Sequence, residues 1–325
     1  MFKDLLSLFL GNKKAFAGIL LLGFFLGIAL LAPVLAPFDP KANRIETTIP
    51  ISDQRDRMRT TERHRIDELT EVSTLTQVIT TTYHRTVRRL PLQAKPSSDH
   101  WLGTTHSGQD IFSQLIWGTQ VTLAVGLLTG LFTTILSLSL ALVGGFLGGI
   151  VDDIISLFTN VFLVIPSLPL MIVIAAYISV RGMIPIILIL GLTSWPWPTR
   201  VLRSQVISLK NRDFVKVSKS LGEKPVYIVF REILPNMISL VMASFFTSTM
   251  AAIIGATTLE FIGLGNPSVV SWGTMLYWAQ VNSALLAGSW WWFLPPGICI
   301  ALIGTSFALM NFAIDEISNP KLRKR

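Results

Sequence analysis

The sequence has few charged residues and a single cysteine. Only 14% of its 325 residues are charged, whereas an average soluble domain has about 25%. One cysteine, Cys299, cannot build a disulfide framework within the chain. The chain lacks a G-x-x-x-x-G-K-S/T loop, so it has no phosphate-binding loop of that type for ATP. The H-E-x-x-H and G-x-S-x-G motifs of metalloproteases and serine hydrolases are absent as well.

The sequence also lacks histidines at the spacing of a metal site, and its long apolar runs contain no charged residue. The four histidines lie outside the apolar runs and form no H-x-x-x-H pair; they are His64, His84, His100 and His106. We therefore predict no metal site, no cofactor and no catalytic residue. Arg181 and Glu260 fall at the ends of apolar runs, where a side chain can reach the membrane interface. Ion-coupled carriers usually hold a charged residue within the membrane, so we expect any transport energy to come from another chain.

Long uncharged runs dominate the rest of the sequence, and the mean hydropathy is +0.58. About 20 apolar residues in a helix cross a hydrocarbon core of ~30 Å. The composition excludes intrinsic disorder and a soluble globular enzyme, and it predicts an all-α polytopic membrane protein. The uncharged runs are 15–38, 111–151, 154–180, 233–259 and 261–314.

These runs predict six transmembrane helices. The first run is longer than the apolar region of a signal peptide and has no clear cleavage site, so we expect it to be retained. Residues 111–118 suit an interfacial helix that leads into the second span. Residues 261–292 are polar and rich in glycine, which suits a stretch at the interface or one that re-enters against protein. The predicted spans are 15–37, 119–147, 155–180, 183–199, 237–258 and 292–312.

The distribution of Lys and Arg favours cytoplasmic termini. With both ends inside, the cytoplasmic segments hold 15 of these residues and the outer segments hold 12, of which 11 lie in 39–110. Long loops are translocated largely regardless of their charge, so the other segments decide the orientation. The same rule explains the net charge of +8 without a nucleic-acid partner.

Residues 41–95 form the only sizeable polar block. The pattern predicts a solvated helix over 53–70 and, from alternation and many threonines, a strand over 72–83. Two interpretations fit this composition. The block is either a small extracytoplasmic cap that meets a partner or a solvated insertion without a partner.

A short amphipathic helix is predicted in the cytoplasmic loop 200–236. Asp213 is placed to cap a helix over 214–221, because its carboxylate can accept the first free N–H groups. Apolar residues recur on one face at i, i+3 and i+7; they are Phe214, Val217 and Leu221. Such a face can dock in the groove of a partner protein.

Two residues set the geometry that follows this helix. Gly222 supplies the left-handed conformation that ends a helix, and Pro225 suits the first position of the next one. The second helix runs toward Pro235 at the foot of the fifth span. The loop is therefore expected to pass rigid-body motion from a docked partner to the membrane.

This loop resembles the EAA loop of ABC importer permeases. The family pattern is E-A-A-x-x-x-G, followed downstream by I-x-L-P. Gly222 matches the glycine, and Leu234 and Pro235 match the Leu-Pro pair. The Glu-Ala-Ala and Ile positions differ here; they hold Lys216, Val217, Ser218 and Glu232. The chain thus lacks the acidic contact to an ATPase that the pattern implies, but it keeps the helix–glycine–helix arrangement.

Further stretches are similar to the second-subunit type of the dipeptide, oligopeptide and nickel permease branch. They are 31–40, 100–126, 259–276 and 290–303. The tail 315–323 resembles the D-x-x-D-P-R-L-R ending of that branch, with Asn319 in place of an aspartate. Gln109 stands where the branch often has arginine. The insertion has no counterpart in the branch.

The resemblance implies an ABC type I importer-like core in the cytoplasmic (inner) membrane. The expected parts are an N-terminal segment with the first span (1–40), an extracytoplasmic insertion (41–99) and a permease core (100–325). The implied partners are a second permease subunit, two ATPase subunits that dock on 213–222, and an extracytoplasmic binding protein. The implied cargo is a peptide or a peptide-like solute, moved by ATP hydrolysis on the ATPase chains. The implied coupling residues are Asp213, Phe214, Lys216, Val217, Ser218, Leu221, Gly222, Leu234 and Pro235.

Two other classes of protein remain as alternatives. A self-sufficient ion-coupled carrier would need an ionisable residue inside the membrane, and the sequence places none there. An intramembrane enzyme would need a catalytic motif or paired aspartates within the spans, which are likewise absent from the sequence.

Overall fold

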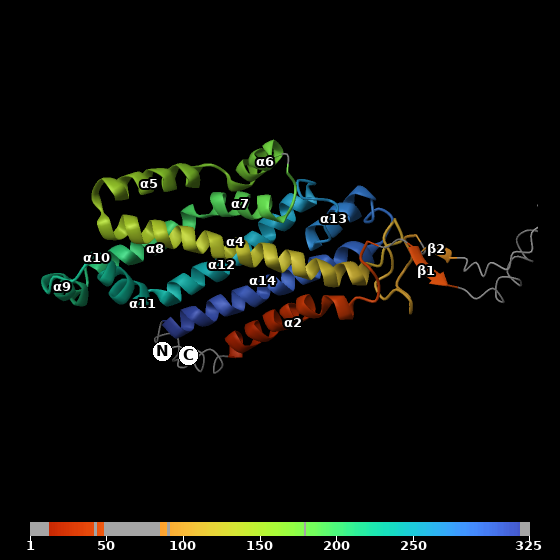
Figure 1. Ribbon diagram of the computed structural model, residues 1–325, viewed down its shortest axis with the longest axis horizontal. Helices are drawn as coiled ribbons and strands as arrows, with labels where there is room; N and C mark the ends of the chain where they lie inside the picture. The colour runs from red at the N-terminus through yellow and green to blue at the C-terminus, as the bar shows by residue number, and fades with distance from the viewer. Residues whose placement is uncertain (1–12, 42–43, 49–84, 90–91, 179, 319–325) are drawn as a thin grey trace, which may run out of the picture.

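The computed structural model describes residues 13–41, 44–48, 85–89, 92–178 and 180–318. This part of the chain is mostly helical, and its long helices run side by side along the longest axis (Figure 1). The longest is α4 (Ile111–Leu147), which packs against α2 (Lys13–Leu35), α8 (Pro196–Lys210) and α12 (Ile238–Phe261). The remaining long helix, α14 (Trp290–Ser318), packs against α2 and α12.

Four of these helices are long and apolar enough to cross a membrane: α2, α4, α12 and α14. A fifth span is possible if α5 (Gly149–Val164) and α6 (Ser167–Tyr177) count together, but a 91° bend separates them. Helix α7 (Met183–Ser194) has only 12 residues, which as a helix reach about 18 Å. The structure therefore supports four or five spans by length and composition, and the predicted sixth is not confirmed.

Several predicted boundaries are wrong. Residues 111–118 are helical and lead into the second span as predicted, but they continue it without a break as the first two turns of α4. The predicted fourth span 183–199 breaks at Trp195, and α8 continues well beyond its predicted end. Pro196 begins α8, because a proline lacks the N–H that a first helical position leaves unused. Sequence periodicity misses such breaks, since the apolar character continues across them.

The prediction of a broken stretch after α12 agrees with the structure. The only helix described in 262–289 is α13 (Trp272–Val281), which is short and lies between α12 and α14. Ser271 begins it with a capping box, in which Ser271 and Thr274 exchange side-chain and backbone hydrogen bonds. Trp272 ties α13 to α4 by donating its backbone N–H to Thr122 Oγ1 at 3.1 Å and its indole N–H to Leu115 O at 3.2 Å.

A two-stranded ribbon modifies the all-α prediction. Strands β1 (Arg44–Thr48) and β2 (Arg85–Arg89) pair antiparallel, with Arg44 opposite Arg89 and Thr48 opposite Arg85. The ribbon joins the two ends of the polar block 41–95. The predicted helix 53–70 and strand 72–83 lie outside the described residues.

Close helix packing relies on glycines that face a neighbouring helix. A Cβ on Gly130 of α4 would collide with Thr249 Oγ1 and lie 2.9 Å from Thr249 Cα on α12. A Cβ on Gly18 of α2 would lie 2.9 Å from the carbonyl oxygen of Ser306 on α14. Ser306 also donates its hydroxyl to the Gly18 carbonyl at 2.7 Å. Small residues let apolar helices approach without the hydrophobic drive that water would supply.

The described ends of the chain lie at one end of the bundle. Helix α2 begins, and α14 ends, at the same end as α9 (Asp213–Ser220) (Figure 1). This placement agrees with a chain whose termini share a side of the membrane with the loop 200–236. Which side that is remains a prediction from the Lys and Arg distribution.

Candidate coupling surface

Helix α9 ends in a Schellman motif at the predicted glycine. Gly222 has φ +78°, in the left-handed region. The N–H of Gly222 donates to Lys219 O at 3.0 Å, and the N–H of Glu223 donates to Ser218 O at 3.1 Å. These two bonds satisfy carbonyl groups that the helix end leaves free. The predicted left-handed stop is confirmed.

The predicted cap at Asp213 is wrong. The helix begins at Asp213 itself, and its N-cap is Arg212, which makes no side-chain capping bond. The Asp213 side chain is instead exposed and lies 3.6 Å from the ammonium of Lys216, one turn later. A carboxylate in the first turn still favours the helix through its dipole. The exposed pair itself contributes little stability.

The apolar face of α9 points away from the protein. Leu221 is 77% exposed and Val217 is 57% exposed, while Phe214 is partly exposed. Val215, which the sequence analysis did not select, is fully buried and belongs to a cluster with Leu209 of α8. The helix is thus held by one side, and its predicted apolar stripe is free on the other.

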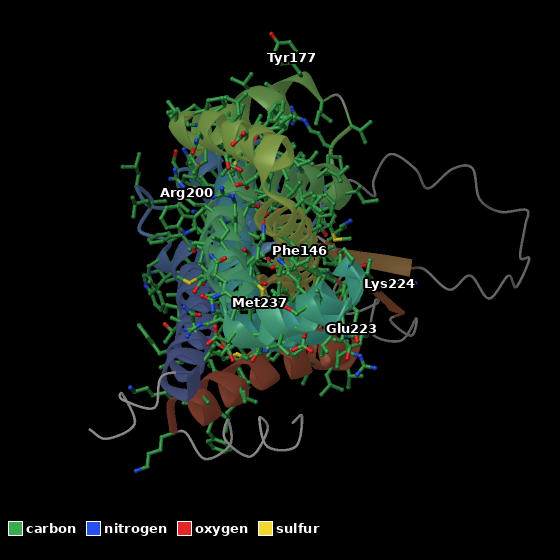
Figure 2. The ribbon with its side chains drawn as sticks, turned by 90° about the vertical axis from the view of Figure 1, so that its left-hand side faces the viewer. Phe146, Tyr177, Arg200, Glu223, Lys224 and Met237 are labelled. Atoms are coloured by element: carbon green, nitrogen blue, oxygen red, sulfur yellow. The ribbon has the colours of Figure 1, made fainter. Side chains whose placement is uncertain are left out.

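A second contact fixes α9 to the end of α4. The Lys219 ammonium lies 5.3 Å from the centroid of the Phe146 ring, and the Lys210 ammonium lies 5.9 Å from it. Figure 2 views the molecule from this end and labels Phe146, Glu223 and Lys224. Two cations near one ring face are attracted by its negative quadrupole. Helices α4, α8 and α9 therefore meet around Phe146.

Helical segments fill the chain from Pro225 to Asn236, and a single turn residue, Met237, separates them from the long helix α12. Helix α10 (Pro225–Tyr227) begins at the predicted proline, and a π-helical segment, η1 (Ile228–Ile233), follows. Helix α11 (Leu234–Asn236) then leads into α12. In η1 the N–H of Leu234 reaches back five residues to Val229 O. The wider turn precedes Pro235, which has no N–H for a regular helical bond.

A bidentate ion pair braces the same end of the molecule. The Arg203 guanidinium of α8 donates through Nε and Nη2 to the two oxygens of Asp152 on α5. One turn away, Arg200 donates to Asn160 Oδ1 at 2.9 Å. The hydrogen bond to Asp152 raises the pKa of Arg203 above its ordinary value. Both predicted cytoplasmic segments, around 152 and from 200 on, therefore meet at the end that carries α9.

The nine predicted coupling residues fall into two groups. Seven lie on α9 or in its terminal turn; they are Asp213, Phe214, Lys216, Val217, Ser218, Leu221 and Gly222. Leu234 and Pro235 lie apart from them, at the foot of α12. The sequence analysis missed Val215 and Lys219, whose contacts hold α9 in place. Val215 is apolar but lies off the face formed by Phe214, Val217 and Leu221. An apolar residue outside that face was the available signal in the sequence that a second side of the helix is buried.

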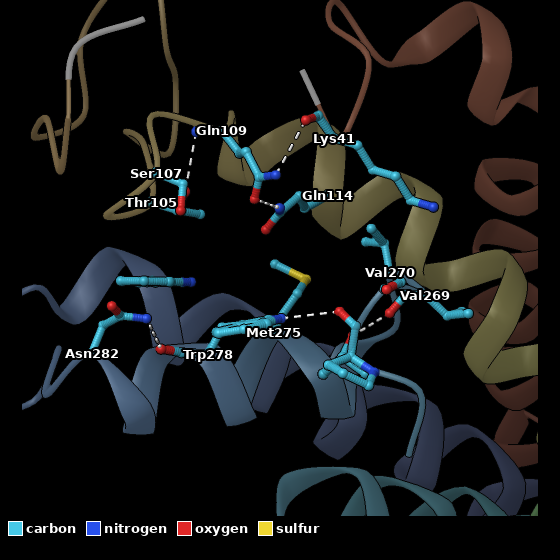
Figure 3. A pocket seen from close by; sticks show the side chains of 14 residues that line it. Lys41, Thr105, Ser107, Gln109, Gln114, Val269, Val270, Met275, Trp278 and Asn282 are labelled. Atoms are coloured by element: carbon cyan, nitrogen blue, oxygen red, sulfur yellow. Dashed lines mark hydrogen bonds between the residues drawn. The ribbon is translucent and has the colours of Figure 1, made fainter. Parts of the chain in front are cut away.

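The other end of the bundle contains a pocket of about 310 Å³ beside α13, which we call the α13 pocket. Its walls come from the segment after α2, the turn before α4, and the stretch from Pro267 to Asn282 (Figure 3). Gln109 donates to Lys41 O at 3.2 Å, and Gln114 donates to Gln109 Oε1 at 2.8 Å. These two hydrogen bonds connect the segment after α2 with the turn before α4 and the start of α4 itself.

Glu260 lies at a span end as expected, but its side chain turns to the start of α13 and does not reach toward the membrane interface. Its side chain is buried and accepts the hydroxyl of Ser271 at 2.6 Å. It also accepts the backbone N–H of Gly273. Both donors belong to the start of α13, where the helix dipole favours a negative charge. The sequence pattern could not predict these hydrogen bonds, because tertiary contacts set the turn that brings the start of α13 back to Glu260.

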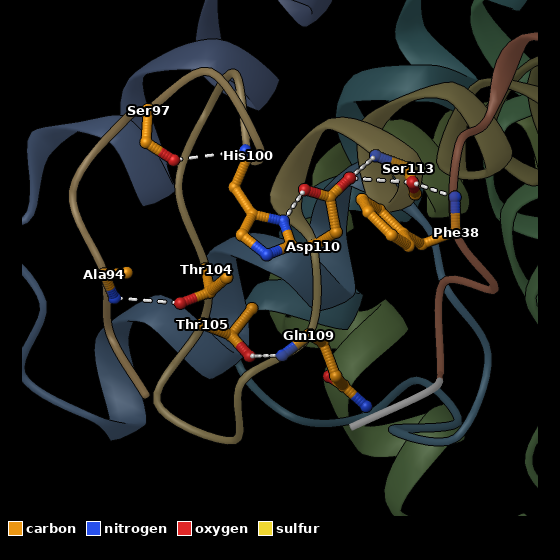
Figure 4. Close-up of polar contacts among 9 residues, drawn as sticks. All are labelled: Phe38, Ala94, Ser97, His100, Thr104, Thr105, Gln109, Asp110 and Ser113. Carbon is orange, nitrogen blue, oxygen red and sulfur yellow. Dashed lines mark hydrogen bonds and ion pairs between the residues drawn. The ribbon is translucent and has the colours of Figure 1, made fainter. Parts of the chain in front are cut away.

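A buried polar network fixes the turn before α4. His100 Nδ1 lies 2.9 Å from Asp110 Oδ1, and both side chains are almost fully buried (Figure 4). Asp110 Oδ2 accepts the N–H of Ser113 at 2.8 Å and its hydroxyl at 2.7 Å, so Asp110 is the N-cap of α4. The backbone N–H of Phe38 donates to Ser113 Oγ at 3.2 Å. The network therefore joins the end of the first span to the start of the second.

Replacing Asp110 with alanine is expected to destabilise the protein by about 3 kcal/mol, because a cap is lost and His100 is left buried without its partner. The thermal unfolding midpoint in detergent should fall clearly. Asp99→Ala is the matched control, because Asp99 is exposed in the same loop and, among the described residues, accepts only a long 3.5 Å bond from Ser98. Equal midpoints for the two variants would contradict a structural role for the network.

Comparison with known proteins agrees with these features. Residues 134–324 match the family described as binding-protein-dependent transport system inner membrane component, and this match includes α9, η1 and α12. The chain belongs to this family. Residues 1–55 additionally match the N-terminal transmembrane domain of oligopeptide transport permease C.

Individual members of the family show how far the similarity extends. The oligopeptide transport system permease protein OppC of Bacillus subtilis is 26% identical over 100% of this chain and 91% of its own length. The glutathione transport system permease protein GsiD of Pectobacterium atrosepticum is 31% identical over 71% of this chain and 76% of its own. A chain of the MetNI methionine ABC transporter, solved in an inward-facing conformation, superposes with a TM-score of 0.50 over 64% of this chain and 95% of its own, at 18% identity. That structure supports the permease fold alone.

Proposed function

We propose that this family member is the membrane-spanning permease subunit of an ATP-driven importer for peptides or peptide-like solutes. The observation that carries the proposal is the geometry of α9 in a family member. Helix α9 has an exposed apolar face at one end of the bundle. Val215 and Lys219 of the same helix anchor it to its neighbours. The similarity to oligopeptide, dipeptide and glutathione permeases supports the class of cargo.

The proposed partners follow from this geometry and from the family. Two ATPase subunits would dock on the α9 faces of this chain and of a second permease subunit. A binding protein would deliver the solute at the opposite end, which places the chain in the inner membrane with α9 inside. The permease itself would carry no catalytic residue.

Coupling would proceed by rigid-body motion. Closure of the ATPases on ATP would push the apolar face of α9. Because the Schellman turn at Gly222 and the helical segments from Pro225 to Asn236 join α9 to the start of α12, the push would reach a membrane helix through one turn residue, Met237. The Asp152–Arg203 pair would carry the same motion to α5. The two permease chains would then open their shared path to the other side.

The ion-coupled carrier alternative gains little from Glu260. This carboxylate is buried in the last turn of the spanning helix α12, as a proton relay would be. However, the carboxylate accepts hydrogen bonds from the Ser271 hydroxyl, through Oε2, and from the backbone of Gly273. Its contacts therefore suit a structural anchor for α13.

Affinity purification of Leu221→Asp from native membranes tests the proposal. A charge at this exposed position should stay harmless to folding but break an apolar docking face, because burying an unpaired carboxylate is costly. We expect wild type to co-purify with a second permease and ATPase subunits, and the variant to lose the ATPases, with at least about tenfold less bound by mass spectrometry.

Leu286→Asp is the matched control, because Leu286 is 90% exposed at the other end of the bundle. It should retain the ATPases. If wild type purifies alone and takes up solute on an ion gradient, the importer proposal fails and the carrier interpretation replaces it. Equal ATPase recovery from both variants would remove α9 as the docking face.

A further inference from the structure

We propose that the α13 pocket binds the C-terminal carboxylate of a short peptide. The inference rests on the proposed function, because it assigns to this subunit a contact with the cargo. The pocket of about 310 Å³ lies within the size range of small-molecule sites. Helix α13, which forms one of its walls, lies at the opposite end of the bundle from α9 (Figure 1).

An unpaired buried donor points to a ligand. Trp292 lines the pocket, and its side chain is only 1% exposed. Its indole N–H has no hydrogen-bond partner among the described residues. Buried N–H groups almost always have an acceptor, because an unpaired one costs about 1–3 kcal/mol. A ligand that brings an oxygen would supply the acceptor.

The charge of the pocket selects an anionic acceptor. Among the described residues that line it, Lys41 alone carries a formal charge. Its ammonium forms no ion pair with a carboxylate of the described chain. A carboxylate accepts about four hydrogen bonds and gains the stronger, charge-assisted kind from an ammonium. A ligand with an ammonium group would instead be repelled by Lys41, because no carboxylate among the described lining residues offsets the two positive charges.

The remaining wall suits the body of a peptide. Trp278 is 42% exposed, and its indole N–H is held by Pro267 O at 3.1 Å, so the ring is fixed in orientation. Met275 lies next to it in the wall, and a flexible thioether adapts to different apolar side chains. The combination of one cation, a free indole donor and an adaptable apolar wall fits a peptide terminus of variable sequence.

The test measures peptide binding to the complex that carries this chain, purified in nanodiscs without ATP. The probe is labelled tri-alanine, compared with its C-terminal amide. We expect the amide to bind about tenfold more weakly, the effect of one charge-assisted contact. Trp292→Phe, which keeps the ring and removes the N–H, and Lys41→Ala should each weaken tri-alanine binding by about three- to tenfold. Lys41→Ala should leave binding of the amide unchanged.

Two matched controls separate the pocket from general effects. Trp291 also has a buried indole N–H without a partner but does not line the pocket, so Trp291→Phe should bind tri-alanine like wild type. Lys95 is exposed and also lies outside the pocket, so Lys95→Ala should bind normally as well. Equal binding of acid and amide, or equal losses in the control variants, would overturn the proposal.

A third probe distinguishes the source of the carboxylate. N-acetyl-Ala-Glu-Ala-amide carries its only carboxylate on a side chain, as a loop of a partner protein would. Tighter binding of this probe than of tri-alanine would overturn the assignment to a peptide terminus. Uptake of tri-alanine by the reconstituted complex is measured separately. Uptake without any effect of Lys41→Ala or Trp292→Phe would refute the pocket and leave the importer intact, whereas absent uptake would refute the importer.

Discussion

Replacing Gly222 with valine is expected to lower ATP-driven uptake by at least about tenfold while ATP hydrolysis by the complex continues. Gly222 has φ +78°, and a β-branched residue there costs at least about 1–2 kcal/mol. A Cβ at this position meets no atom within 4 Å, so the cost is in the backbone and not in packing. The chain would relieve it by leaving the left-handed region, which turns α9 relative to η1 and breaks the mechanical link to α12. Uptake and phosphate release measured on the same vesicles give the coupling ratio.

Two variants separate this effect from simple strain. Gly288 has φ +69° and open space around its Cα, but it lies at the other end of the bundle. Gly288→Val should therefore bear similar strain and keep the coupling ratio of wild type. Gly222→Asn should retain most uptake, because asparagine tolerates the left-handed region. Normal uptake by Gly222→Val would show that the Schellman turn does not transmit the motion.

Replacing Gly130 with valine is expected to destabilise the bundle by about 3 kcal/mol or more. The new Cβ would overlap Thr249 Oγ1 and lie 2.9 Å from Thr249 Cα, so the backbones of α4 and α12 would have to separate. Overpacking of this kind costs about 1–3 kcal/mol and more where backbone is involved. The yield of folded protein from membranes and the thermal unfolding midpoint in detergent should both fall.

Gly27→Val is the control for this prediction. Gly27 lies on α2, and a Cβ there meets no described atom within 4 Å. The added methyl groups should therefore change the free energy of unfolding by less than about 0.5 kcal/mol. A Gly130→Val protein as stable as Gly27→Val would mean that α4 and α12 can repack without loss, and that the close approach is not required.

Local signals in the sequence predicted the backbone of the segment after α9 well. Gly222 and Pro225 act through their own backbone properties, so their roles could be inferred without knowing any neighbour. The exposed stripe on α9 followed from spacing alone. The cap at Asp213 failed by one residue, because the position of a helix start depends on where the preceding turn leaves the chain.

Polar groups that act across the fold could not be predicted in this way. His100 and Asp110 meet in a buried pair, and Glu260 is taken up by the start of α13. In both cases the partners are brought together by a turn and not by a helical repeat.

The sequence by itself determined that this is a helical membrane protein and that a short amphipathic helix, α9, precedes Gly222. The length of an uncharged run and the backbone properties of glycine and proline are local features. They can therefore be recognised in the sequence without knowing the fold. Only the tertiary structure decided where the helices break, which side of α9 is anchored, and which polar residues line the α13 pocket. Those features depend on contacts between residues far apart in sequence, such as Lys41, Gln109 and Trp292, and packing alone brings such residues to one place.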